Sequence, residues 1–135
     1  MLAQNLTMLA MGTDATSVLA ENVRRLYLDL GWSQVELARR AGLAQKTVND
    51  LLNYGRTVKK TPTLATVESI AAAFGISPWH LQIPDLPLDL LKGQRVDKLV
   101  ENFRDSSELG RENVLRIAES EVRYQVVVEG DKKTG

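Results

Sequence analysis

Apolar residues recur three or four positions apart along most of this chain, and this spacing predicts a succession of short helices. The first stripe consists of Leu19, Val23, Leu26 and Leu30. The same spacing predicts six further helices, at about residues 33–41, 44–53, 63–74, 78–81, 88–103 and 109–124. A strand-like pattern appears only at residues 124–128 (YQVVV), which are too few to define a sheet alone. The pattern therefore predicts an all-α fold.

Polar residues at the ends of these stretches agree with the expected helix boundaries. Ser33 and Glu36 are spaced as a capping box, and Gly42 suits the end of the same helix. Thr63 and Pro78 suit the starts of the fourth and fifth helices. On the second and fourth helices, the residues expected to face inward are Val35, Leu37, Ala38, Ala41, Leu64, Val67, Ile70, Ala71 and Phe74.

Two prolines within residues 83–89 (IPDLPLD) mark the clearest boundary, because neither allows a continuous helix. We therefore expect a compact domain at residues 16–84 and a helical region at 85–135. Residues 1–12 (MLAQNLTMLAMG) lack the basic start of a secretory signal, and polar residues interrupt them. We expect residues 1–15 to form a flexible arm, or to include an overlong translation start.

The composition narrows the chemistry that the chain can perform. The 135 residues are 44% hydrophobic and 25% charged, as in an ordinary globular protein. There is no cysteine and one histidine, His80, so no cofactor and no metal site is expected. No apolar run approaches the roughly 20 residues of a membrane span. The net charge is zero, yet residues 20–60 carry eight basic and four acidic residues. The neutral total therefore includes a basic first half.

Four positions within residues 32–56 have the spacing that two closely packed helices need. Ala38 is small where the helices would approach, and Gly42 permits a positive φ in the turn between them. Val48 and Leu51 can anchor the second helix against the first. This is the requirement of a helix-turn-helix.

The match extends beyond these four positions. Residues 33–56 (SQVELARRAGLAQKTVNDLLNYGR) and 62–81 (PTLATVESIAAAFGISPWHL) resemble the phage repressor and Cro-like helix-turn-helix family, with its xenobiotic-response-element-type domain. The resemblance covers about residues 17–84. It implies a compact five-helix DNA-binding domain whose third helix enters the major groove, followed here by two further helices. Some relatives carry a self-cleaving peptidase domain, but the remaining fifty residues lack the strands for one.

The resemblance also implies roles for individual residues. Those placed against base edges are Ala44, Gln45, Lys46, Asn49 and Asp50. The two amides suit adenine, the lysine suits guanine or phosphate, and the aspartate suits cytosine. Those placed against phosphates are Ser33, Gln34, Thr47, Tyr54, Arg56, Lys59 and Lys60. The loop after the third helix is longer than the family pattern, with Tyr54 before Gly55, which puts the individual loop contacts in question.

The helices after residue 85 carry apolar stripes that suit oligomerisation. The residues expected to form a homodimer interface are Leu91, Leu99, Val100, Phe103, Val114, Leu115, Ile117 and Val122. Residues 124–130 (YQVVVEG) could add a short strand between subunits. The alternative is that these helices only complete the core of one copy.

The function that the resemblance implies is a sequence-specific transcriptional regulator in the cytoplasm, associated with the nucleoid. We expect a prophage-type repressor that binds a palindromic operator in double-stranded DNA as a homodimer, with no membrane and no small-molecule ligand. An antitoxin-like protein, whose C-terminal helices bind a protein partner, is the alternative. No catalytic constellation is visible, so an enzyme is not expected. The polar third-helix face could also be merely solvated, and His80, Trp32 and Trp79 are expected to be structural.

Overall fold

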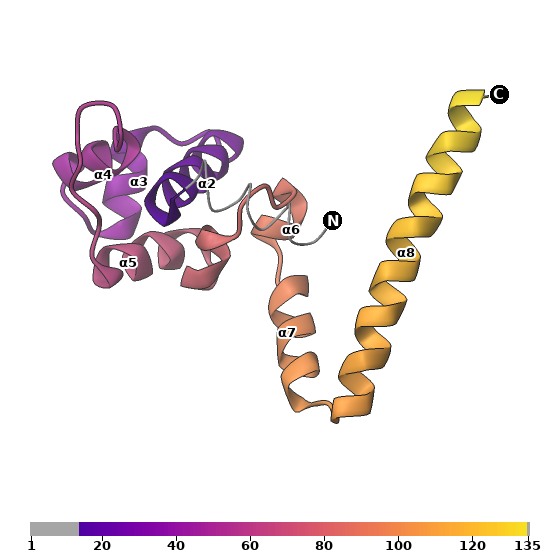
Figure 1. The fold of residues 1–135 in the computed structure, drawn as a ribbon. Helices are drawn as coiled ribbons and strands as arrows, with labels where there is room; N and C mark the ends of the chain where they lie inside the picture. The colour runs from indigo at the N-terminus through magenta and orange to yellow at the C-terminus, as the bar shows by residue number, and fades with distance from the viewer. Residues whose placement is uncertain (1–13, 135) are drawn as a thin grey trace. The chain divides into compact units, whose positions relative to one another are not determined.

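The computed structural model describes residues 14–134, with side chains as far as residue 127. The predicted flexible arm therefore lies almost wholly outside the described residues. Within them the chain is helical and has no strand, so the all-α prediction is confirmed (Figure 1). The helices are α2 (Ala15–Asp29), α3 (Gln34–Ala41), α4 (Gln45–Leu52), α5 (Leu64–Phe74), the 3₁₀ helix η1 (Pro78–Gln82), α6 (Leu88–Lys92), α7 (Arg95–Asp105) and α8 (Glu108–Thr134).

The chain divides into two compact units, residues 1–94 and 95–135, called the first and second unit below. The first unit continues ten residues past the expected boundary at residue 84, because the segment after η1 remains attached to α2. The side-chain amide of Asn22 donates to the carbonyl oxygens of Leu81 and Ile83, both at 2.9 Å. The Arg25 guanidinium donates to the carbonyl of Leu86 at 2.7 Å. The segment that contains the two prolines therefore stays hydrogen-bonded to α2.

A single hydrophobic core joins the helices of the first unit. Its fully buried members come from α2, α3, α4, α5, η1 and α6; the largest are Leu19, Leu26, Leu37, Ile70, Leu81 and Leu91. Two residues expected to face inward do not: Val35 is 54% exposed and Leu64 is 82% exposed. Each stands in the first turn of its helix. The prediction was wrong for both because that turn projects beyond the core.

Aromatic side chains pack at two places in the first unit, the turn between α2 and α3 and the 3₁₀ helix η1. Trp32, in the turn between α2 and α3, stacks on Phe74 with ring centroids 5.5 Å apart, and the Arg40 guanidinium lies 4.4 Å from the Trp32 ring. His80 is fully buried, its Nδ1 lies 3.3 Å from the carbonyl oxygen of Leu91, and the Trp79 ring packs edge-on against it. These positions agree with structural roles.

The predicted helix at 88–103 is two helices, because the chain is extended at Gly93. In the second unit, the Arg111 side chain closes the turn between α7 and α8 by donating to the carbonyls of Phe103 and Arg104, at 3.0 and 2.6 Å. The short intersubunit strand that residues 124–130 could add does not form, because α8 continues through these residues. In the described residues the valines have no neighbouring strand to pair with, and strand preference depends on such packing. No described helix is long and apolar enough to cross a membrane.

Candidate nucleic-acid interface

The turn between α3 and α4 fixes the angle at which the two helices leave each other. The Ser33 hydroxyl accepts from the backbone N–H of Glu36 at 3.1 Å and begins α3. Gly42 ends α3 with φ of +67°, in the left-handed region that favours glycine, and Leu43 N–H then donates to the Ala38 carbonyl at 2.9 Å. Ala38 and Val48 are buried at the contact. The four positions of the predicted motif therefore have the expected geometry.

The polar face of α4 lies on the surface. Val48, Leu51 and Leu52 are buried on the opposite side of this helix. The residues expected to contact bases are Gln45, Lys46 and Asn49, all exposed, Asp50, half-buried, and Ala44, the exposed residue that precedes the helix. The structure thus places all five predicted base-contacting residues together on one short helix and its N-cap.

Two contacts along α4 order this polar face before any ligand is present. Lys46 Nζ lies 2.9 Å from Asp50 Oδ2. Asn53, the residue that ends α4, donates through its amide nitrogen to the side-chain and backbone oxygens of Asn49, both at 2.8 Å. The hydrogen bond from Asn53 uses one lone pair of the Asn49 oxygen, so the Asn49 amide can still both donate and accept. Asn53 was not among the predicted site residues, although its spacing of four from Asn49 is a signal that sequence alone could have used.

The N-terminus of α3 and the face of α4 border the same shallow hollow. Its lining consists of Gln34, Val35, Gln45, Lys46 and Asn49. Gln34, predicted to contact phosphate, therefore lies beside the predicted base-contacting residues. The exposed Val35 was missed, because its helical position suggested the core.

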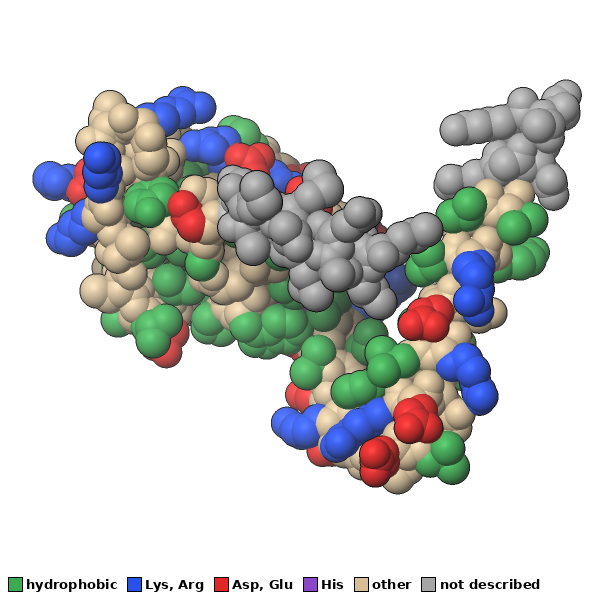
Figure 2. Space-filling view, in the orientation of Figure 1, with side chains coloured by type: hydrophobic (Ala, Val, Ile, Leu, Met, Phe, Trp, Pro, Cys, Tyr) green, Lys and Arg blue, Asp and Glu red, His purple; other side chains and the backbone are tan. Residues whose placement is uncertain are grey.

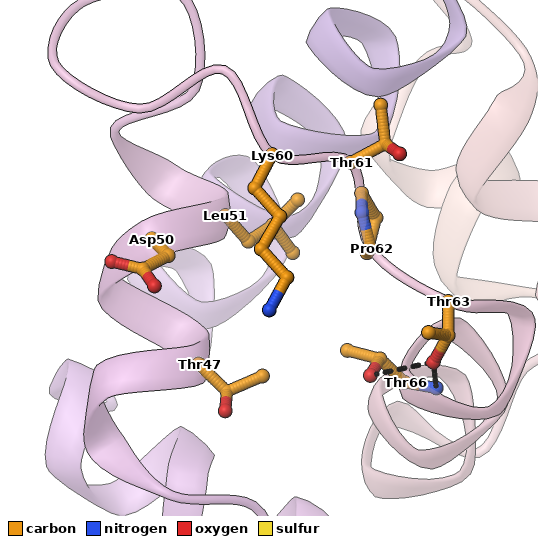
Figure 3. A pocket seen from close by; sticks show the side chains of 8 residues that line it. All are labelled: Thr47, Asp50, Leu51, Lys60, Thr61, Pro62, Thr63 and Thr66. Carbon is orange, nitrogen blue, oxygen red and sulfur yellow. Dashed lines mark hydrogen bonds between the residues drawn. The ribbon is translucent and has the colours of Figure 1, made fainter.

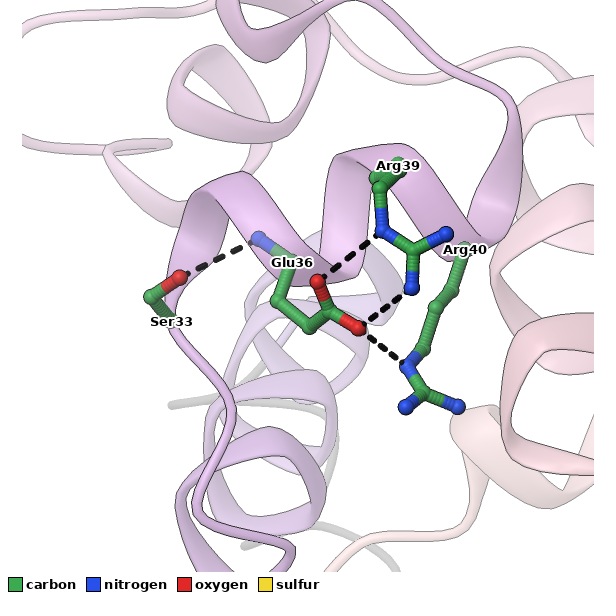
Figure 4. Close-up of polar contacts among 4 residues, drawn as sticks. All are labelled: Ser33, Glu36, Arg39 and Arg40. Carbon is green, nitrogen blue, oxygen red and sulfur yellow. Dashed lines mark hydrogen bonds and ion pairs between the residues drawn. The ribbon is translucent and has the colours of Figure 1, made fainter.

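On α3, two arginines pair with the Glu36 carboxylate and neutralise its negative charge (Figure 4). The Glu36 carboxylate accepts from Arg39 at 2.7 and 3.0 Å and from Arg40 at 2.7 Å. The hydrogen bonds from Arg39, and then those from Arg40, lower the pKa of Glu36 from 4.5 to about 2. Glu36 is therefore ionised at neutral pH and neutralised by the two guanidinium groups. Its carboxylate was expected to complete a capping box, but it faces the arginines instead.

Of the remaining predicted phosphate contacts, Thr47 lies in the first turn of α4, and the others lie in the loop after it: Tyr54, Arg56, Lys59 and Lys60. Lys60 points into a hollow between α4 and the start of α5, whose rim includes the hydroxyl groups of Thr47, Thr63 and Thr66 (Figure 3). Arg56 and Lys59 are exposed in the loop after α4, while Tyr54 is half-buried. Figure 2 shows Lys and Arg side chains gathered over the end of the unit that carries α4 and this loop.

The residues predicted for dimerisation divide between the two units. Leu91 is fully buried in the first unit, so its assignment to an interface between copies is a correction: it belongs to the core of one copy. In the second unit Phe103 and Val114 are half-buried, and the others are exposed: Leu99, Val100, Leu115, Ile117 and Val122. In the described part of the chain, no three side chains of metal-binding type come together.

The chain is similar in sequence to a known protein family and to individual proteins. Residues 23–78, which contain α3, the turn and α4, match the helix-turn-helix family. The chain is 32% identical over 100 residues to a protein named Neisseria hypothetical transcription factor, from Neisseria meningitidis serogroup B; the match covers 74% of this chain and 83% of that protein. It also resembles the crystal structure of the hypothetical transcription factor NHTF from Neisseria, at 34% identity and a TM-score of 0.46, covering 58% of this chain and 84% of that one.

Proposed function

Because the chain belongs to the Cro-type helix-turn-helix family of DNA-binding transcriptional regulators, we propose that it is a repressor that binds a palindromic operator as a homodimer. The observation that carries the proposal is the exposed polar face of α4 beside the N-terminus of α3.

The size and chemistry of α4 suit the major groove of DNA. Eight residues at about 1.5 Å each make a helix about 12 Å long, which matches a groove about 12 Å wide. Its outward face offers the amides of Gln45 and Asn49, the ammonium of Lys46 and the carboxylate of Asp50. Base edges in this groove present both donors and acceptors, so a mixed face can contact all four bases specifically, whereas a purely basic face selects mainly guanine.

The start of α3 suits a phosphate next to that groove. The first N–H groups of a helix have no partner within the helix, and the helix dipole favours an anion there. Gln34 adds an exposed side-chain amide at the same end. Since Glu36 is neutralised by Arg39 and Arg40, its carboxylate does not repel a phosphate. Contacts of this kind set the position of the recognition helix on the DNA.

The second unit supplies surfaces that suit a second copy. The exposed apolar side chains of α7 and α8 are unfavourable in water, and burial against another chain removes them from it. A dimer with two α4 helices about 34 Å apart would recognise two half-sites one DNA turn apart. Occupancy of such a site excludes other proteins from the same DNA, which is the basis for repression.

One feature of α8 also favours a partner of a different kind. Leu115 and Ile117, two positions apart, lie on different sides of the helix, and both are exposed. A single partner helix covers only one side. An antitoxin-like role, in which one face of α8 binds another protein and DNA binding is secondary, is therefore the second candidate.

Selection of binding sites from random duplex DNA, at two salt concentrations, tests the main proposal. We expect an enriched palindrome with half-sites one turn apart, and a binding constant that falls with salt because phosphates are neutralised. Enrichment of no sequence would contradict the proposal. Recovery of the chain with a different protein in fixed stoichiometry, together with enrichment of single half-sites only, would favour the antitoxin-like role.

A further inference from the structure

Val35 is an exposed apolar residue in polar surroundings. Several large apolar side chains of the first unit are exposed, namely Leu28, Leu30, Val35, Leu64 and Trp79. Scattered exposed apolar residues are normal in soluble proteins. Of these five, however, only Val35 lines the shallow hollow between α3 and α4, where its neighbours are the polar side chains of Gln34, Gln45, Lys46 and Asn49. An apolar group in this hollow therefore faces the same ligand as the polar groups beside it.

The first turn of α3 holds the Val35 side chain in a defined direction. Val35 follows Gln34, the first residue of α3, and the Ser33 hydroxyl fixes the start of this helix by accepting from the N–H of Glu36. A valine in a helix has one strongly preferred side-chain rotamer, so its two methyl groups lose little entropy when they contact a ligand. Helical side chains also lean toward the N-terminus of their helix. The methyl groups of Val35 are therefore directed to the end of α3 that is proposed to bind phosphate.

The base edges of the major groove offer one apolar group, the C5-methyl group of thymine. C5 lies on the outer side of the pyrimidine ring, so this methyl group lies close to the sugar–phosphate backbone of its own strand. With α4 in the groove and the start of α3 on a bordering phosphate, the hollow between the two helices covers the margin of the groove. A thymine methyl group at that margin therefore lies where the Val35 side chain is presented.

We propose that Val35 contacts the C5-methyl group of a thymine at the margin of each half-site and makes the protein prefer thymine to cytosine there. The proposal rests on the operator binding proposed above and adds a determinant of specificity to it. Contact between the valine and the thymine removes apolar surface of both from water. Cytosine has no methyl group, and its N4 amino group would lose water against an apolar side chain that cannot accept a hydrogen bond.

Replacement of thymine by deoxyuridine in the selected operator tests this contact, because it removes the methyl group and keeps the Watson–Crick pair. Each thymine of one half-site is replaced in turn, and fluorescence anisotropy measures the affinity of the full chain. We expect the wild type to bind about fourfold more weakly at the contacted position, because burial of one methyl-sized group contributes about this factor. Val35→Ala should lose this dependence at that position and keep any dependence at other thymines.

Leu64→Ala is the matched control, because it shortens another exposed apolar side chain in the first turn of a helix, outside the hollow. It should keep the wild-type difference between thymine and uracil. Val35→Thr keeps the branched shape and replaces one methyl group by a hydroxyl, so it should reduce this difference without changing the volume of the side chain. Circular dichroism of each variant verifies the helical fold, which an exposed substitution should leave intact.

The outcomes separate this proposal from the one it rests on. A selected half-site without thymine, or one in which uracil is tolerated at every position by the wild type, would overturn the role of Val35 and leave operator binding intact. The same holds if Val35→Ala distinguishes thymine from uracil as the wild type does at every position. A selection that enriches no half-site would overturn the operator binding itself.

Discussion

Single side chains on α4 are constrained before DNA is present. The ion pair of Lys46 with Asp50 and the hydrogen bonds of Asn53 to Asn49 hold in place groups that we propose contact bases. Exposed pairs of this kind contribute little to stability, because water screens them and both side chains must be ordered. We expect a larger effect on the proposed DNA binding, since a side chain already in position loses less entropy when it contacts a base.

The amides of Gln45 and Asn49 give the first prediction. Replacing both by alanine should remove discrimination between the selected operator and random DNA, because each bidentate amide contact contributes about 1–3 kcal/mol. We expect the ratio of the two binding constants to fall by a factor of roughly thirty or more. Fluorescence anisotropy with the two duplexes measures it.

Gln82→Ala is the control for that change, because it removes an exposed amide of the same kind from η1, away from α4. It should leave the ratio unchanged. Retention of full discrimination by the double variant of α4, with its helical spectrum intact, would remove these amides from the interface.

The second prediction concerns the Glu36 carboxyl group, whose pKa is lowered to about 2 by hydrogen bonds from Arg39 and Arg40. A lowered pKa means that the ionised form stabilises the folded state. This contribution is complete above pH 4.5, the ordinary value, and is lost as the pH falls from 4.5 towards 2. The difference in unfolding free energy between wild type and Glu36→Gln should shrink over that range.

Nuclear magnetic resonance of the Glu36 carboxyl carbon gives the direct measurement. The titration midpoint should lie near 2, and Arg39→Gln should raise it more than Lys60→Gln, which removes a charge that does not contact Glu36. A wild-type midpoint near 4.5 would show that the arginine contacts do not persist in solution.

At the scale of elements, the short helix α6 belongs with the first unit. Its Leu91 is fully buried in the core, and Lys92 pairs with Asp29 of α2 at 2.9 Å. Its Leu91 carbonyl oxygen lies 3.3 Å from the imidazole of His80. The helix therefore holds η1 against α2 and extends the unit beyond the five helices that the family pattern implies.

Leu91→Ala supplies the third prediction. It should lower the unfolding free energy of the first unit by about 2–5 kcal/mol, because it leaves a cavity in a closely packed core. Urea denaturation monitored by Trp32 and Trp79 fluorescence measures the loss. The control is Leu64→Ala, the same change at a position 82% exposed, which should cost less than about 0.5 kcal/mol. Equal losses at both positions would contradict the placement of α6.

At the scale of the whole molecule, the two units differ in how far their apolar side chains are buried. The first unit buries a large set of apolar side chains in one core, although Leu28, Leu30, Val35, Leu64 and Trp79 stay exposed. In the second, no residue of α7 is buried, and α8 exposes Leu115, Ile117 and Val122. This difference is the basis for proposing that the second unit is the one that associates with another chain.

The fourth prediction is that the chain has a mass in solution of twice 15.0 kDa, measured by light scattering after gel filtration. Val122→Asp should shift it to one chain and weaken operator binding, because two linked half-site contacts become one. Leu64→Asp, at an exposed leucine of the first unit, is the matched control and should remain dimeric. A wild-type chain of 15.0 kDa at micromolar concentration would contradict the dimer.

The amino-acid sequence predicted those features that depend on neighbours close in the chain. The helices through η1 and the left-handed turn at Gly42 follow from local spacing and end residues. The common face of Gln45, Lys46 and Asn49 follows from the period of one helix. The prediction of buried positions was wrong at Val35 and Leu64, because the helical period does not show at which turn a helix first contacts the core.

By itself, then, the sequence determined the all-α fold, the helix-turn-helix and the polar composition of its second helix. Only the tertiary structure decided that Leu91 is a core residue and that Asn22 and Arg25 keep residues 81–86 on α2. These outcomes depend on which distant groups meet, with about sixty residues between Asn22 and its acceptors. Such contacts form because buried polar groups need partners and apolar groups leave water, and no local pattern records the pairing.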